Sequence, residues 1–251
     1  MNRSLSVLSR FNGLRIAITG AKGSLGKSLT KELKNKGAYV VGLTHTKKNN
    51  SISLESDPNE WIIWTCGKEE LLSKKLFDFD ILILNHGFNP KGLIDSPNIN
   101  KAMEINTISH WRLIQIFEDL ALKKYDHNQE NYRPKEIWIN TSEAEIQIAF
   151  SPLYEMTKRV IGEIVSLKKS NSLFEDSESL IIKKLVLGPF KSKLNPQGIM
   201  TSDFVSKQII KIAETKKYLI IVSPNPFTYL LMPIIEVIRI VYSIIVNKIY
   251  S

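Results

Sequence analysis

Short apolar runs alternate along the chain with longer stretches in which apolar residues recur at helical spacing. Leu25, Leu29 and Leu33 repeat every four positions, for example, until Gly37 ends the pattern. Strands that alternate with helices predict βαβ units and a parallel sheet covered on both faces. The apolar runs predict seven strands, at residues 14–19, 38–43, 61–64, 80–85, 136–140, 180–187 and 218–222.

The end of the chain, residues 227–251, has a different pattern. We expect a helix over residues 233–250, about 27 Å long at about 1.5 Å per residue, with Pro233 in its first turn. It is too charged for a confident single membrane span. It suits an amphipathic helix at a membrane surface, while packing on the protein's own core or on a second subunit are the alternatives. A narrow polar stripe would comprise Glu236, Arg239, Ser243 and Asn247, and the interfacial anchors would be Tyr229, Tyr242, Lys248 and Tyr250.

Three glycines lie between the first predicted strand and the first predicted helix, in TGAKGSLG (residues 19–26). A first glycine permits a tight turn, a second lets the backbone approach a pyrophosphate, and a third allows close packing of the helix on the strand. The helix N-terminus then offers free N–H groups to the phosphates. The alternative is a plain tight turn. We expect the cofactor contacts here to be Gly20, Lys22, Gly23, Ser24, Leu25 and Gly26.

The residue that follows the second strand bears on cofactor choice. NAD-selective sites usually place an acid there for the ribose 2′-hydroxyl, but this chain has Thr44 and no acid before Glu55. Basic residues surround the position instead, which favours NADP(H) over NAD(H); a solvated basic turn is the alternative. The residues able to meet a 2′-phosphate are Lys22, His45, Lys47 and Lys48.

A tyrosine and a lysine four residues apart are the candidate catalytic pair. Tyr154 and Lys158, in YEMTK, project from one face of a predicted helix. A cation near a phenol lowers the pKa of the phenol, so Tyr154 becomes a usable acid or base for a carbonyl/alcohol pair. Thr141 and Ser142 stand at the carboxyl end of the fifth strand, where sheets of this kind bind ligands.

These motifs, in this order, resemble the short-chain dehydrogenase/reductase family. LNHG (residues 84–87) resembles the family's Asn-Asn-Ala-Gly motif, with His86 in the alanine place. MEINTIS puts Asn106 at the family's helix asparagine. LGPF (residues 187–190) resembles its Pro-Gly turn in reversed order. The resemblance implies an α/β fold: one Rossmann-type, doubly wound parallel sheet over residues 1–226, followed by the C-terminal helix.

The resemblance also implies roles for the site residues. Tyr154 would exchange the proton of the substrate oxygen, and Ser142 would hydrogen-bond that oxygen. Lys158 would hold the nicotinamide ribose, and Asn106 would anchor a water of the proton relay. Besides the loop residues, the cofactor contacts would be Thr44, His45, Asn85, Gly87, Tyr154, Lys158 and Pro189.

Some features depart from the family pattern. The spacing from Ser142 to Tyr154 is one residue short, so Thr141 remains a rival for the serine role. Cys66 or Gly67 stands where an aspartate near the adenine is usual. The glycine spacing is that of the extended branch, but 251 residues fit the compact branch better. The chain also resembles proteins labelled bifunctional sterol desaturase/short-chain dehydrogenase, without histidine clusters or a multi-span region of a desaturase.

Composition limits the partners. Lys and Arg number 34 against 25 Asp and Glu, a net charge of +9, which favours anionic partners such as a phosphorylated cofactor or acidic lipid. Because the basic residues are spread along the chain and form no known module, we expect no nucleic acid. One cysteine and four scattered histidines exclude a disulfide scaffold and a thiolate zinc site, so no metal is expected. Without a secretory signal pattern, we expect a cytoplasmic protein, either free or peripheral at a membrane.

The leading hypothesis is an NADP(H)-dependent enzyme that transfers hydride between nicotinamide and a carbonyl or alcohol of a lipophilic small molecule. One alternative is a dinucleotide-binding regulatory or scaffold protein. Another is an epimerase or dehydratase of the same family. The family resemblance implies a homo-oligomer, formed through the helices that begin near Ile99 and Pro152.

Overall fold

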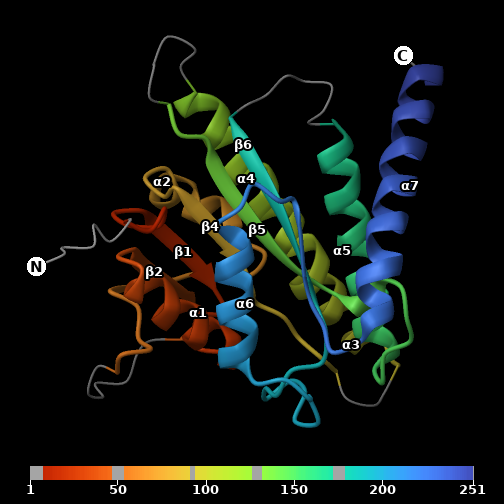
Figure 1. Ribbon diagram of the computed structural model, residues 1–251, viewed down its shortest axis with the longest axis horizontal. Coiled ribbons are helices and arrows are strands. Elements are labelled where there is room, and N and C mark those ends of the chain that lie inside the picture. Colours follow the sequence, from red (N-terminus) through yellow and green to blue (C-terminus); the bar gives the residue numbers. More distant parts are fainter. Residues whose placement is uncertain (1–7, 47–53, 91–93, 126–131, 172–178, 251) are drawn as a thin grey trace, which may run out of the picture.

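The strands form one parallel sheet of seven, in the order β3-β2-β1-β4-β5-β6-β7 (Figure 1). The computed structural model describes residues 8–46, 54–90, 94–125, 132–171 and 179–250, with the backbone alone for Asn247 and Tyr250. The predicted α/β fold is confirmed, and each strand lies within two residues of its predicted bounds. The strands are β1 Arg15–Thr19, β2 Tyr39–Thr44, β3 Glu60–Ile63, β4 Ile81–Leu84, β5 Lys135–Ser142, β6 Leu180–Leu187 and β7 Leu219–Val222.

The strand order creates a reversal point at the centre of the sheet. The chain runs outward from β1 through β2 to β3, returns to β4 on the other side of β1, and continues to β7. Ala17 of β1 lies opposite Val41 of β2 and Leu82 of β4, and all three are buried. The crevice outside the carboxyl ends of β1 and β4 is where sheets of this topology bind ligands.

Helices cover both faces of the sheet. On one face, α1 (Ser24–Asn35) packs against α6 (Ser202–Ala213), and both contribute to one apolar core. The other face is covered by η1 (Glu69–Leu72), α2 (Ser73–Leu76), α4 (Ser109–Lys124) and α5 (Pro152–Asn171), which contribute to a second core. Three shorter elements lie along the carboxyl edge: α3 (Ser96–Met103), η2 (Glu104–Ile108) and η3 (Glu143–Glu145).

The C-terminal helix α7 (Pro226–Tyr250) runs along α5 at the outside of the molecule (Figure 1). It begins earlier than the sequence predicted, so Pro233 lies inside the helix and not in its first turn. The physical reason is a better start at Asn225, whose side-chain oxygen accepts a hydrogen bond from Phe227 N at 3.0 Å. Pro226 then takes the first helical position, where its missing N–H costs nothing.

Two adjacent lysines of β6 point to opposite faces of the sheet, and both are buried. The Lys183 ammonium reaches the carbonyl oxygens of Thr215 and Lys217, at 2.7 and 3.2 Å. Lys184 lies on the α5 and α7 side, where its side chain has no exposed area. A strand with two charged residues is therefore compatible with the sheet interior because each ammonium finds acceptors.

Candidate active site

The loop between β1 and α1 has no room for a side chain at two of its predicted cofactor glycines, Gly20 and Gly26. Gly20 has a φ of +64°, and a Cβ at Gly26 would lie 2.4 Å from the Gly20 carbonyl oxygen. Gly23 is the N-cap of α1 and makes no side-chain cap bond, and the first turn contains no acid. The first N–H groups of the helix, at Ser24 and Leu25, are therefore suited to an anion. The loop fits a pyrophosphate.

The carboxyl end of β2 is flanked by cationic or titratable groups. The Lys22 ammonium donates to the carbonyl and hydroxyl oxygens of Thr46, at 2.9 and 2.8 Å. Thr44 is buried, and its hydroxyl accepts a bond from Thr46 N at 3.3 Å. His45 is exposed beside them. Two further residues expected to meet a 2′-phosphate, Lys47 and Lys48, lie outside the described residues.

The segment after β4 is tied to the loop after β1. Asn85 donates through its backbone N–H to the Thr19 hydroxyl at 2.8 Å. His86 is buried, with Nδ1 at 2.8 Å from the same hydroxyl and its ring stacked on His110 at 4.1 Å between centroids. Burial, with help from His45, lowers the pKa of His86 to about 3, so the imidazole is neutral. The unusual histidine in the LNHG motif is thus an uncharged side chain held in place between Thr19 and His110.

The helix asparagine lies in a π-helical turn, η2, a distortion that is frequent at functional sites. Its side chain is fully engaged. Asn106 Oδ1 accepts from Phe88 N at 2.7 Å, and Nδ2 donates to Phe88 O at 2.7 Å and to the Thr157 hydroxyl at 3.0 Å. Asn106 therefore fixes the segment that follows Gly87 onto α5.

Thr141 and Ser142, the rivals for the serine role, differ in their contact with Tyr154. Both hydroxyls donate to carbonyls of the neighbouring strand β6, Thr141 to Leu185 at 3.2 Å and Ser142 to Leu187 at 3.4 Å. The Ser142 hydroxyl accepts from Ala144 N at 3.2 Å and also interacts with the phenol of Tyr154, whose pKa it lowers in part. This geometry favours Ser142 as the partner of Tyr154.

The Tyr154 and Lys158 side chains lie together in the first turns of α5. The Lys158 ammonium is 5.6 Å from the centre of the Tyr154 ring and donates to the Asn140 carbonyl at 2.8 Å. Burial lowers the pKa of Lys158 to about 8, although nearby Glu145 opposes the shift. Burial raises the pKa of Tyr154 to about 12. In the ligand-free protein the phenol is thus less acidic than usual, whereas the sequence pattern predicted a lowered pKa, because desolvation outweighs the hydrogen bond with Ser142.

A line of hydrogen bonds joins the cofactor loop to this pair. Asn85 Nδ2 donates to the Gly20 carbonyl at 3.4 Å, and Asn85 Oδ1 accepts from Asn140 Nδ2 at 3.1 Å. The Asn140 carbonyl in turn accepts from Lys158. The predicted residues at the ends of β1, β4 and β5 therefore share one edge of the sheet. Pro189 stands at the same edge after β6, and its carbonyl accepts from Ile199 N at 2.9 Å.

Two residues of this edge were missed from the sequence. Asn140 supplies the link just described, and Glu145 is buried next to Lys158 and Lys184. The signal for Glu145 was present in INTSEAE, where two acids directly follow a buried strand. Only the fold reveals which of them points inward, because the three-residue helix η3 turns the chain there.

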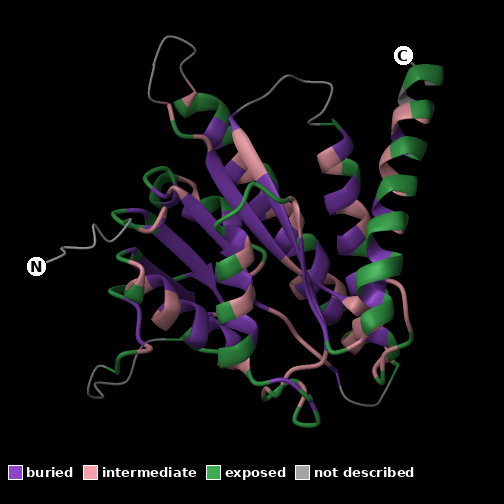
Figure 2. Ribbon diagram, viewed as in Figure 1, coloured by how far each residue is buried: buried purple, intermediate pink, exposed green. Residues whose placement is uncertain are grey.

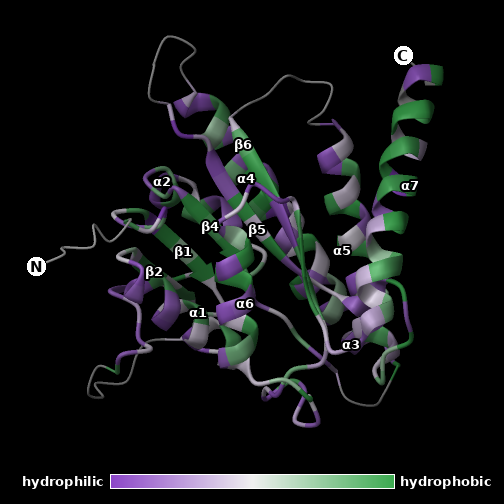
Figure 3. Ribbon diagram, in the orientation of Figure 1, coloured by the Kyte–Doolittle hydropathy of each residue, from purple (hydrophilic) through white to green (hydrophobic). Residues whose placement is uncertain are grey.

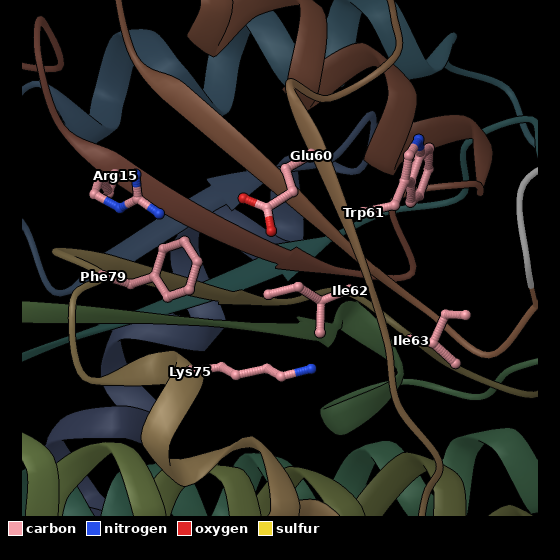
Figure 4. Close-up of a pocket in the computed structure, with 7 residues that line it drawn as sticks. All are labelled: Arg15, Glu60, Trp61, Ile62, Ile63, Lys75 and Phe79. Atoms are coloured by element: carbon pink, nitrogen blue, oxygen red, sulfur yellow. The ribbon is translucent and has the colours of Figure 1, made fainter.

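A surface concavity lies away from this edge. A cavity of about 450 Å³ lies beside the edge strand β3 and opens near the amino ends of the strands, as Arg15 and Phe79 show (Figure 4). No described group of three or more His, Cys, Asp or Glu side chains is arranged to hold a metal ion. The remaining lining residues of the cavity are Glu60, Trp61, Ile62, Ile63 and Lys75.

Comparison with solved structures identifies the fold. The chain matches a short-chain dehydrogenase from Burkholderia cenocepacia J2315 in complex with NADP, with a TM-score of 0.68 and 14% identity over 84% of this chain and 88% of that one. It also matches a short-chain dehydrogenase from Sphingobium yanoikuyae in complex with NADPH, with a TM-score of 0.66 and 14% identity over 83% and 87% of the two chains. At this identity, the match shows the fold alone.

Sequence comparison finds one curated relative at much higher identity. Monoglucosyldiacylglycerol epimerase from Synechocystis sp. (strain ATCC 27184 / PCC 6803 / Kazusa) is 38% identical over 238 residues, which are 94% of this chain and 55% of the relative. The chain thus spans about half the length of that protein. No family model matches the sequence.

Proposed function

Since this chain has the fold and the ordered motifs of the short-chain dehydrogenase/reductase family, we propose that it is an NADP(H)-dependent enzyme acting on a lipophilic small molecule. The reaction is hydride transfer at a carbinol or carbonyl carbon. The observation that carries the proposal is the line of hydrogen bonds from Gly20 through Asn85 and Asn140 to Lys158, beside Tyr154 and Ser142.

Three side chains have different roles at the substrate oxygen. Ser142 donates a hydrogen bond to that oxygen, and Tyr154 exchanges its proton. The Lys158 ammonium stabilises negative charge on the phenol. A phenol with a pKa near 12 still loses its proton readily to a developing alkoxide, so the ligand-free protein is ready to act as the acid of a reduction. The nicotinamide, when bound, supplies or accepts the hydride.

The phosphate groups of the cofactor would lie on the glycine loop and the first N–H groups of α1. Lys22 and His45 flank the end of β2, where no acid is present to select a free ribose hydroxyl. This supports NADP(H) over NAD(H), in agreement with the NADP and NADPH found in the matched structures. A fluorescence titration with each reduced nucleotide tests the preference; tight NADPH binding and weak NADH binding are expected.

The curated relative favours a second candidate, an epimerase of a glycolipid headgroup. Epimerisation would use the same groups twice: Tyr154 takes the hydroxyl proton as the carbinol carbon is oxidised to a ketone, with its hydride held by the bound nicotinamide. Tyr154 then returns the proton when the same hydride is delivered to the opposite face of the ketone. The substrate would then be a sugar carried on a diacylglycerol, which is lipophilic as the first candidate requires. A glycolipid substrate favours a protein that is peripheral at a membrane, on its cytoplasmic face, and the family resemblance favours a homo-oligomer.

The test uses the full chain with NADP⁺ and monoglucosyldiacylglycerol in mixed micelles. An epimerase yields a second hexose in the hydrolysed lipid without net accumulation of NADPH, whereas an alcohol dehydrogenase accumulates NADPH. Tyr154→Phe is expected to abolish either reaction and to leave the NADPH affinity unchanged. Unchanged turnover in this variant would overturn the proposed role of Tyr154.

A further inference from the structure

The helix α7 has its polar side inside and its apolar side outside. Glu236 and Ser243 are buried against the domain, and Arg239 is half-buried. Among the described side chains of the helix, Met232 alone belongs to the buried apolar clusters. Ten large apolar side chains, each 43–69% exposed, form the outer stripe: Phe227, Leu230, Leu231, Ile234, Val237, Ile238, Val241, Tyr242, Ile245 and Ile249.

Buried ion pairs hold the helix in this orientation. Glu236 binds the Lys184 ammonium at 2.5 Å, and Arg239 binds Glu145 at 2.8 Å and Glu163 at 2.7 Å. Rotating α7 about its axis, to turn the outer stripe inward, would leave the buried charges of Glu145, Lys184 and Glu236 without these partners, which is strongly unfavourable. The outer stripe is therefore fixed toward the surroundings (Figures 2 and 3).

The length of the outer stripe and the charge of the protein suit binding to a lipid surface. It extends over about 33 Å at about 1.5 Å per residue. It is therefore a contiguous apolar surface, whereas soluble proteins commonly expose only single, scattered apolar side chains. Residues 226–246 are apolar and long enough to cross a membrane, and only 17% of the most apolar window is buried. Their only charged residues, Glu236 and Arg239, form ion pairs with the domain, so the outer stripe itself carries no charge. The net charge of +9 suits anionic lipid.

The outer stripe continues toward the candidate active site. The segment that joins Ser142 to Tyr154 carries Ile148, 91% exposed, and a fully exposed Phe150. This segment is tied to the start of α7, because Asn225 Nδ2 donates to Gln147 Oε1 at 2.8 Å. The apolar tips therefore stand next to the first turn of the outer stripe and beside the catalytic edge of the sheet.

We propose that the outer stripe of α7, together with Ile148 and Phe150, docks the protein on the surface of an anionic bilayer and brings the Ser142–Tyr154 edge to the lipid headgroups. The inference deepens the proposed function, on which the choice of a lipid partner rests. Each side chain that enters the interface contributes apolar burial, and the spread of basic residues adds attraction to anionic headgroups.

The test is sedimentation of the full chain with vesicles of 70% phosphatidylcholine and 30% phosphatidylglycerol. The wild type is expected to bind these vesicles and to bind pure phosphatidylcholine less tightly. Ile234→Gln with Ile238→Gln removes two apolar contacts from the centre of the outer stripe, and about a 100-fold loss of affinity is expected. Leu71→Gln with Leu122→Gln, two exposed leucines on η1 and α4 outside the outer stripe, is the matched control and should bind as wild type.

Several results would overturn the docking proposal. One is a wild type that does not sediment with anionic vesicles, and another is equal binding by the Ile234/Ile238 variant. A third is a lipid-free dimer that this variant converts to monomer, with no vesicle binding, since the occupant would then be a second copy. Two readouts separate this proposal from the enzymatic one: the Ile234/Ile238 variant should bind NADPH normally, and Tyr154→Phe should sediment as wild type while remaining inactive.

Discussion

Replacing Lys184 by Met tests the buried charges that hold α7 in place. The Lys184 ammonium, with no exposed area, contacts the carboxylates of Glu145 and Glu236, the Gly162 carbonyl and the Ser166 hydroxyl. Methionine keeps most of the apolar stem, so the change removes mainly the charge and its hydrogen bonds.

The magnitude follows from what the substitution leaves behind. Two carboxylates would remain buried, with Arg239 as their shared cation, at 2.8 Å from Glu145 and 3.3 Å from Glu236. Breaking a buried pair by removing one partner costs about 3–5 kcal/mol. Removing both members of the pair, with Lys184→Met and Glu236→Met together, should restore at least about 2 kcal/mol relative to the sum of the single changes, because no uncompensated charge is left on either side.

The assay is urea unfolding at equilibrium, with the free energy of unfolding extrapolated to water. At a slope of about 3 kcal/mol per molar urea, Lys184→Met should lower the midpoint by about 1 M or more. Lys207→Met, at an exposed position on α6, is the control and should change stability by less than about 0.5 kcal/mol. A loss below about 1 kcal/mol for Lys184→Met would refute the claim that these ion pairs fix the helix.

Two further predictions concern the candidate active site. Ser142→Ala should lower kcat by about 100-fold or more through loss of a hydrogen bond to the substrate oxygen, whereas Thr141→Val should leave kcat within about threefold; equal losses would reopen the assignment. Lys158 keeps its proton up to a pKa of about 10.5 when unfolded but only to about 8 when folded, so the free energy of unfolding should rise between pH 8 and pH 10.5. The free energy of unfolding of Lys158→Met should rise by up to about 3 kcal/mol less than that of the wild type over this pH range, measured by urea unfolding at each pH. The same pH dependence in both proteins would contradict the conclusion that burial lowers the pKa of Lys158.

The sheet could be predicted well because its signals are local. A run such as DILILN (residues 80–85) is apolar over its whole length, which suits only a strand buried on both faces, and the glycines of residues 20–26 are spaced for one kind of turn. The motif residues fall at the ends of successive strands, and parallel strands bring those ends to one edge. The fold class and the side of the sheet that carries the site therefore followed from the sequence.

Other properties depended on contacts between distant segments. The pKa of Tyr154 is set by how much water the fold removes from the phenol, and the spacing to Lys158 gives no measure of that. The choice between Thr141 and Ser142 depended on which hydroxyl reaches Tyr154, since carbonyls of the neighbouring strand β6 accept from both. Asn140 gained its linking position only when β4 and β5 paired.

The C-terminal helix separates the two kinds of information most clearly. The sequence by itself determined that α7 has a narrow polar stripe on an apolar helix, because that pattern is a property of residue spacing alone. The sequence did not determine which stripe faces the protein, since the spacing of polar and apolar residues is the same whether the polar side lies inside or outside. The tertiary structure decided this by placing Lys184 and Glu145 opposite Glu236 and Arg239. Buried charges require partners, so the polar stripe turned inward and the apolar stripe was left outside.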